Sequence, residues 1–129
     1  MLQEELKPNY FALAQQEDQA LHDEVMHMGM DLGEEVFITQ SQALRDRPDS
    51  SDTLADVSCP TLVLCGEEEK LCSVEMHEHM AQSIPQASLK VIDHCGHLSS
   101  IERPQAVNGA IETWLQESSL NKGVSSGAR

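Results

Sequence analysis

The chain has 129 residues, a length that fits one domain or part of one. Its 22 acidic and 8 basic side chains give a formal net charge of −14, which repels phosphate backbones and anionic membrane surfaces. No signal peptide is recognisable in MLQEELKPNY, and the longest strongly apolar run, residues 61–65, is too short to span a bilayer. We therefore expect neither nucleic-acid nor membrane binding, and a cytoplasmic location.

The first third of the chain is expected to be helical. Gly33 interrupts one periodic segment, and a second helix begins at Glu34 and ends before Pro48, which disfavours helix at the residue in front of it. The Ser/Asp cluster after Pro48 is expected to be a loop. Residues 1–20 are weakly periodic, so they are predicted to be a ragged helix or partly disordered. The apolar positions at helical spacing are Leu21, Val25, Met28 and Leu32.

The second half shows the order β-α-β-α. Residues 61–65 are apolar without alternating, between Pro60 and Gly66, which is typical of a strand buried on both faces of a parallel sheet. A helix with Ser73 as its N-cap follows and ends at Pro85. Residues 88–92 are a second strand, and Pro104 begins a last helix with one apolar face. Residues 119–129 are expected to be a flexible tail.

Two loops of this α/β unit are expected to meet. Parallel strands joined by a helix end at the same edge of the sheet, which is where ligands bind in open α/β sheets. The residues 66–72, GEEEKLC, leave the first strand at this edge, and 93–100, DHCGHLSS, leave the second. An acid from 67–69 can therefore meet an imidazole from 94–97.

Several motifs in this order resemble the C-terminal part of the α/β-hydrolases. They are a Pro-Thr-Leu-Val strand running into a glycine and an acidic loop, a helix ending in Ile-Pro, a strand, and Gly-His followed by Glu-Arg-Pro before the final helix. The resemblance covers roughly residues 57–116. It implies that 1–50 is a helical cap-like segment and that 51–118 is the C-terminal part of an α/β-hydrolase sheet.

The resemblance also implies a catalytic pair. His97 takes the place of the family's catalytic histidine, and Glu69 stands where the family usually has an aspartate. The extra methylene of glutamate is a departure that can misplace the carboxylate. Glu67 and Glu68 therefore stay open as alternative acids. No cofactor is implied.

The family's nucleophile is expected to be absent from this chain. It belongs to a G-x-S-x-G elbow that precedes the acid and the histidine, and no such elbow precedes Gly66. The chain is accordingly expected to be a fragment of a Ser-acid-His hydrolase that acts on a small ester or related carbonyl substrate. It is expected to self-associate or to join a subunit that carries the missing half. The alternative is a non-catalytic docking module.

A third hypothesis is a metal site. His94, Cys95 and His97 carry zinc-type donors, although H-C-x-H is not an established ligand spacing and a further ligand would have to come from elsewhere. We favour Cys95 as a packed small residue and predict no metal. A disulfide framework is also not expected, because the four cysteines form no C-x-x-C pair and Cys59 and Cys65 lie at opposite ends of an extended segment.

Overall fold

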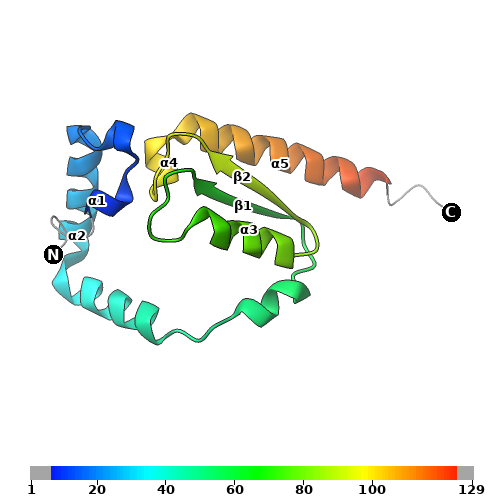
Figure 1. Ribbon diagram of the computed structural model, residues 1–129, viewed down its shortest axis with the longest axis horizontal. Coiled ribbons are helices and arrows are strands. Elements are labelled where there is room, and N and C mark those ends of the chain that lie inside the picture. The colour runs from blue at the N-terminus through cyan, green and yellow to red at the C-terminus, as the bar shows by residue number, and fades with distance from the viewer. Residues whose placement is uncertain (1–6, 125–129) are drawn as a thin grey trace.

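The computed structural model describes residues 7–124. Figure 1 shows helices on both sides of a small sheet, with α1 and α2 gathered beside one end of it. In chain order the elements are α1 (Lys7–Tyr10), the 3-10 helix η2 (Leu13–Gln15), α2 (Gln19–Asp46), the 3-10 helix η3 (Ser51–Asp56), β1 (Thr61–Gly66), α3 (Val74–Ser83), β2 (Ala87–Ile92), α4 (Ser99–Glu102) and α5 (Pro104–Val124).

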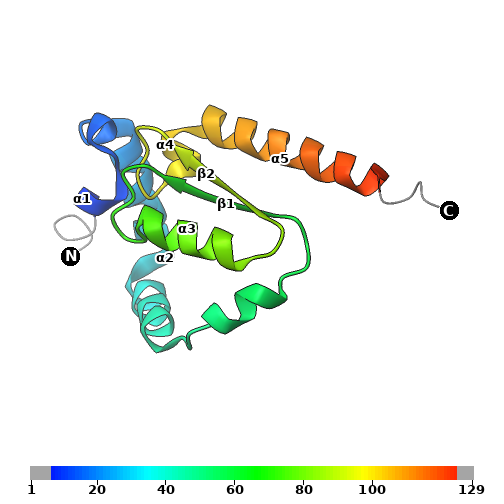
Figure 2. The same cartoon turned by 45° about the vertical axis from the view of Figure 1, so that its right-hand side comes forward.

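The predicted β-α-β-α unit is confirmed. β1 and β2 are parallel neighbours whose register runs from the pair Thr61–Ala87 to the pair Gly66–Ile92. The side chain of Ser73 caps α3 by accepting a hydrogen bond from the backbone N–H of Met76 at 3.4 Å. Figures 1 and 2 show the sheet lying between α3 and α5. Both strands therefore end at one edge, where their loops come together.

The core lies between this sheet and α5. Ile92, Cys95 and Val107 form a buried cluster, and Leu64 packs against it. On β1, Val63 and Cys65 are buried on one face of the strand, and Leu64 between them faces the other way, against this cluster, so both faces of the strand are covered. Removing this apolar surface from water is the main stabilisation of the unit, and it fixes the ends of both strands.

The cap-like helical segment has the predicted interruption. Gly33 has φ 79° and ψ 171°, a conformation that breaks α2 into two arms and that glycine adopts without a Cβ penalty. The expected loop after Pro48 is wrong in part, because Ser51–Asp56 forms a 3-10 helix. Asp49 promotes this turn: one oxygen of its carboxylate accepts from the N–H and the hydroxyl of Ser51, at 2.9 and 2.6 Å.

Both terminal segments contain ordered structure within residues 7–124. Phe11 and Ala12, within the weakly periodic residues 1–20, are completely buried. At the other end, α5 runs to Val124 and so enters the predicted tail 119–129. The remaining terminal residues, 1–6 and 125–129, lie outside the described part. Within residues 7–124, no helix combines the length and the apolar character that a membrane crossing requires.

Candidate active site

The loops after β1 and β2 are tied to each other through their backbones. The N–H of Glu67 donates to the carbonyl oxygen of Ile92 at 2.9 Å, and the N–H of Glu68 donates to that of Cys95 at 2.8 Å. A Cβ at Gly66 would collide with the carbonyl oxygens of Cys95 and Gly96. Glycine at the end of β1 therefore lets the acidic loop approach the histidine loop closely.

This approach brings Glu69 and His97 together. Glu69 Oε2 lies 2.7 Å from His97 Nδ1. The Glu69 side chain is 5% exposed, whereas that of His97 is 34% exposed. An ionised carboxylate only accepts hydrogen bonds, so Nδ1 carries the hydrogen in this contact and Nε2 is left as the basic nitrogen. The extra methylene of Glu69 does not prevent the contact.

The second oxygen of Glu69 is held by its own loop. Oε1 accepts from the N–H of Leu71 at 2.7 Å and from the N–H of Cys72 at 3.2 Å. Burial raises the pKa of Glu69, but the hydrogen bonds from Leu71, His97 and Cys72 together outweigh burial and hold that pKa below its usual value. The carboxylate is therefore ionised at neutral pH and pre-set in position.

The neighbouring acids serve other groups. Glu67 Oε2 accepts from the N–H of His94 at 3.2 Å, and this bond helps to hold His94 at a positive φ of 50°. Glu68 Oε2 accepts from the N–H of Leu13 at 2.8 Å. Of the three acids left open by the sequence, Glu69 is the one that the structure places against His97.

Residues 10–13 form an unpredicted part of the site. The N–H groups of His97 and Leu98 both donate to the carbonyl oxygen of Tyr10, at 2.8 and 3.4 Å. The rings of Tyr10 and His97 stack with centroids 5.8 Å apart and an angle of 20° between their planes. The weak periodicity of residues 1–20 carried no signal for these contacts, because they depend on long-range packing.

Glu102 is a further residue that sequence reasoning missed. It is 8% exposed, and its carboxylate accepts hydrogen bonds from the backbone N–H groups of Ala12, Gly96 and Leu98. The available signal was an acid in the first turn of a helix, which is typical of capping. That signal predicts the bond to Leu98, the N-cap of α4, but not the bonds to Gly96 and Ala12.

The other members of the His/Cys cluster do not join this pair. Cys95 is fully buried, and burial followed by the charge of Glu102 raises its pKa to about 11. It is therefore a neutral thiol rather than a thiolate ligand at pH 7. His94 is exposed. Across residues 7–124, no three His, Cys, Asp or Glu side chains gather in an arrangement that could hold a metal ion.

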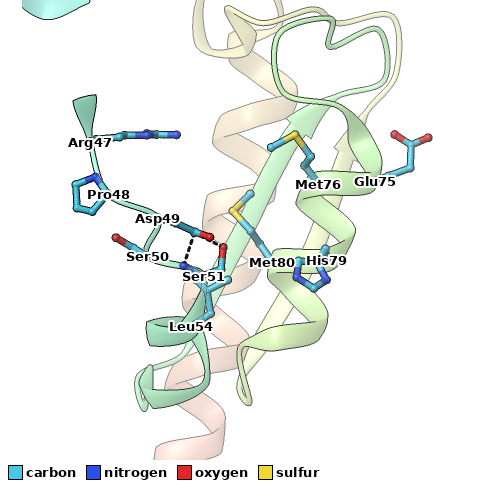
Figure 3. Close-up of a pocket in the computed structure, with 10 residues that line it drawn as sticks. All are labelled: Arg47, Pro48, Asp49, Ser50, Ser51, Leu54, Glu75, Met76, His79 and Met80. Atoms are coloured by element: carbon cyan, nitrogen blue, oxygen red, sulfur yellow. Dashed lines mark hydrogen bonds between the residues drawn. The ribbon is translucent and has the colours of Figure 1, made fainter. Parts of the chain in front are cut away.

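A cavity of about 580 Å³ lies away from the pair, between α3 and residues 47–54. Figure 3 shows Met76 and Met80 pointing from α3 toward this segment, while Glu75 points away. Neither Glu69 nor His97 lines the cavity. It is open, and its walls are largely methionine and loop surface. The chemistry-bearing groups are therefore concentrated at the strand ends and not here.

The letters of the nucleophile motif do occur once, at residues 123–127, Gly-Val-Ser-Ser-Gly. The pattern therefore occurs in the sequence, but after the histidine and not ahead of Gly66. This copy begins in the last two residues of helix α5 and comes after the histidine, whereas an elbow lies between a strand and a helix ahead of the acid. Residues 125–127 lie outside the described part of the chain.

Comparison with known proteins shows the family of this chain. The family model described as "alpha/beta hydrolase fold" matches residues 2–104. A thermophilic esterase from Thermogutta terrifontis superposes with a TM-score of 0.83 at 33% identity, covering 89% of this chain and 43% of that one. The chain is 32% identical over 66 residues to (E)-2-((N-methylformamido)methylene)succinate hydrolase of Acinetobacter baylyi, covering 51% of this chain. It is 34% identical over 67 residues to bifunctional epoxide hydrolase 2 of Mus musculus, covering 52% of this chain.

These relatives are longer than the matched region. The match spans 25% of the Acinetobacter baylyi hydrolase, 12% of the mouse epoxide hydrolase and less than half of the esterase. The parallel strands, the helix between them and the loops at their ends correspond to the portion that the sequence motifs indicated. The family match extends over most of the chain, so the chain belongs to the alpha/beta hydrolase family.

Proposed function

We propose that this chain supplies the acid and the general base of a Ser-acid-His hydrolase. The observation that carries the proposal is the 2.7 Å contact between Glu69 Oε2 and His97 Nδ1, made by an ionised and nearly buried carboxylate. A histidine oriented in this way presents Nε2 as a base, which is the arrangement needed to activate a hydroxyl nucleophile. The relatives are hydrolases by name, which supports the same reaction class.

The proposed chemistry is acyl transfer to a serine followed by hydrolysis. His97 Nε2 takes the proton of the nucleophile as its oxygen attacks the substrate carbonyl, and the imidazolium then gives that proton to the leaving group. Glu69 stays ionised and stabilises the imidazolium through Nδ1–H. Water is activated by the same base in the second half of the reaction. The substrate class is a small ester or related carbonyl compound.

The nucleophile is proposed to come from polypeptide outside these 129 residues, in the same chain or in a partner subunit. The match spans less than half of the relatives' length, which supports a partial site. β1 pairs with β2 along one edge, and the described residues provide no strand for its other edge. Such an edge is a template for a further strand. The partner is therefore proposed to extend the sheet beside β1.

The experiment restores the missing part. Residues 1–129 are joined to the nucleophile-bearing N-terminal part of the Thermogutta terrifontis esterase, in place of the matching region of that enzyme. Turnover of p-nitrophenyl acetate is then measured for the chimera, for the chimera with His97→Ala, and for the chain alone. We expect repeated turnover by the chimera and none by the chain alone. His97→Ala should lower the turnover rate of the chimera by about 10²–10⁴-fold.

Circular dichroism and gel filtration establish that each protein is folded. A folded chimera whose turnover does not change on His97→Ala would contradict the proposal. A folded chimera without any turnover would contradict it as well, and would favour the non-catalytic docking module. Turnover by the chain alone well beyond one equivalent, with contaminating esterase removed, would contradict the external nucleophile.

A further inference from the structure

We propose that Glu102 is a positioning residue, which sets the orientation of His97 by gathering residues 96–98 and residues 10–13 around one buried carboxylate. The catalytic meaning of this role rests on the proposed function, but the structural role does not. The hydrogen bonds of Glu102 go to the backbone N–H groups of Ala12, Gly96 and Leu98, and not to Glu69 or the His97 ring. Its effect therefore passes through the backbone on either side of the histidine.

The two oxygens of Glu102 accept different hydrogen bonds. Oε1 accepts from the N–H of Ala12 at 2.8 Å and from the N–H of Gly96 at 3.0 Å. Oε2 accepts from the N–H of Gly96 at 3.1 Å and from the N–H of Leu98 at 3.1 Å. One carboxylate therefore holds the residue before His97, the residue after it and the segment that lies across it.

The remaining N–H in this run is held by the same segment. His97 donates its N–H to the Tyr10 carbonyl oxygen at 2.8 Å, so three consecutive backbone donors, 96 to 98, are all bonded. Because Ala12 is also bound to Glu102, the carboxylate fixes the segment on which Tyr10 stacks against the His97 ring. The backbone and the ring of the histidine thus depend on one acid.

The site requires a carboxylate rather than an amide. An ionised carboxylate offers acceptor sites on both oxygens, and hydrogen bonds to a charged acceptor are stronger than those between neutral groups. A glutamine offers one acceptor oxygen and places N–H groups where the other oxygen stood. Those N–H groups would face the backbone donors of Gly96 and either Ala12 or Leu98. One side of the arrangement would therefore be lost in Glu102→Gln.

The test uses the whole chain labelled with nitrogen-15. Histidine ring nitrogens report which of Nδ1 and Nε2 carries the hydrogen, and backbone amides report hydrogen exchange. In the unsubstituted protein we expect His97 to hold the Nδ1–H tautomer in one fixed environment. In Glu102→Gln we expect its ring signals to move toward an average of tautomers, and the amides of Gly96 and Leu98 to exchange about tenfold faster, consistent with loss of one charge-assisted hydrogen bond.

The matched control is Glu112→Gln. It removes the same charge from the exposed face of α5, and its His97 signals and amide exchange should equal those of the unsubstituted chain. Glu102→Asp keeps the charge but shortens the reach, and it should give a smaller displacement in the same direction. It also serves if Glu102→Gln does not fold. A residue that only stabilises the fold would lower the melting temperature and leave the His97 signals of the folded molecules unchanged.

Unchanged His97 signals in folded Glu102→Gln, or in folded Glu102→Asp if the first variant fails to fold, would overturn the proposal. These measurements need no turnover. A chain that proves inactive in every chimera can still show the displacement, and an active chimera can coexist with unchanged signals. Failure of the positioning role and failure of the proposed hydrolase function are therefore separate outcomes.

Discussion

Tyr10 holds His97 twice, by its backbone and by its ring. Its carbonyl oxygen accepts the N–H of His97 at 2.8 Å, and the two rings stack at 5.8 Å. Figure 1 shows why this is unexpected from the order of the chain: α1 belongs to the helical segment at one end of the molecule, whereas His97 follows β2. The histidine is thus supported by the cap-like segment as well as by its own sheet.

Tyr10→Ala tests the contribution of the ring, because the backbone carbonyl stays in place, and Tyr10→Phe is its control. Tyr10→Phe keeps the carbonyl and an aromatic ring, so we expect little change in the free energy of unfolding. Tyr10→Ala removes the stack and should cost at least about 0.5–1.5 kcal/mol, the range for an aromatic pair beyond its buried area. Urea unfolding followed by circular dichroism measures both. Equal stability of Tyr10→Ala and the unsubstituted chain would show that the stack contributes nothing.

Gly96 should not tolerate a side chain. A Cβ at this position would lie 2.7 Å from the Tyr10 carbonyl oxygen and from the Ala12 nitrogen, both of them backbone atoms. Gly96→Ala is therefore expected to displace residues 10–12 and to destabilise the chain by roughly 1–3 kcal/mol, as overpacking does in other proteins.

Gly109→Ala is the matched control for this substitution. A Cβ at Gly109 meets no atom within 4 Å, and the residue lies inside α5, where alanine is favoured over glycine by up to about 1 kcal/mol. The control should be neutral or stabilising in the same urea experiment. Equal effects of the two substitutions would contradict the close packing of residues 10–12 on Gly96.

The pH dependence of stability should carry the signature of Glu69. Its pKa is lower in the folded state than the ordinary value of 4.5, so the folded state binds this proton more weakly than the unfolded chain does. The resulting stabilisation is complete above the unfolded pKa and is lost as pH falls through the folded pKa. The free energy of unfolding should therefore fall more between pH 7 and pH 4 in the unsubstituted chain than in Glu69→Gln.

Glu112→Gln controls for the general effect of removing one acid. It should follow the unsubstituted chain, since Glu112 is exposed on α5. If acidification destabilises Glu69→Gln as much as the unsubstituted chain, the carboxylate is not held as described.

Self-association is expected of the isolated chain. β1 has one edge without a strand partner among the described residues, and large apolar side chains are exposed outside the sheet, among them Leu13, Met30 and Leu44. The formal charge of −14 opposes association, so added salt should increase the scattering mass by screening that charge. Light scattering that gives the mass of one chain at high concentration and high salt would contradict this expectation.

Local patterns were enough to predict the α/β unit. The apolar run between Pro60 and Gly66, and Ser73 as an N-cap, are signals that depend on neighbouring residues, and β1 and α3 have them where expected. The meeting of the acidic loop with the histidine loop followed from topology, since parallel strands end at one edge. The choice of Glu69 over Glu67 and Glu68 depended on the resemblance to the family.

The support around His97 could not be predicted in the same way. The bonds from Glu102 to Ala12 and from Glu68 to Leu13 join residues distant in the chain, and no short-range pattern marks them. Residues 10–13 do not form one face of a long helix, because the ring of Phe11 is buried beside His22 and the backbone of residues 10–12 packs on Gly96. Long-range packing of this kind becomes visible only in three dimensions.

The pair Glu69–His97 is tested most directly by a double-mutant cycle in the chimera that carries a nucleophile. Steady-state kinetics with p-nitrophenyl acetate are compared for the unsubstituted chimera, His97→Ala, Glu69→Gln and the double variant. The effects of residues that act as one unit are non-additive. Glu69→Gln should therefore lose much of the turnover that His97→Ala loses, and the double variant should be hardly slower than His97→Ala alone. Glu67→Gln and Glu68→Gln are the matched controls and should be much milder. A nearly silent Glu69→Gln beside a severe Glu67→Gln or Glu68→Gln, or a silent His97→Ala, would contradict the account.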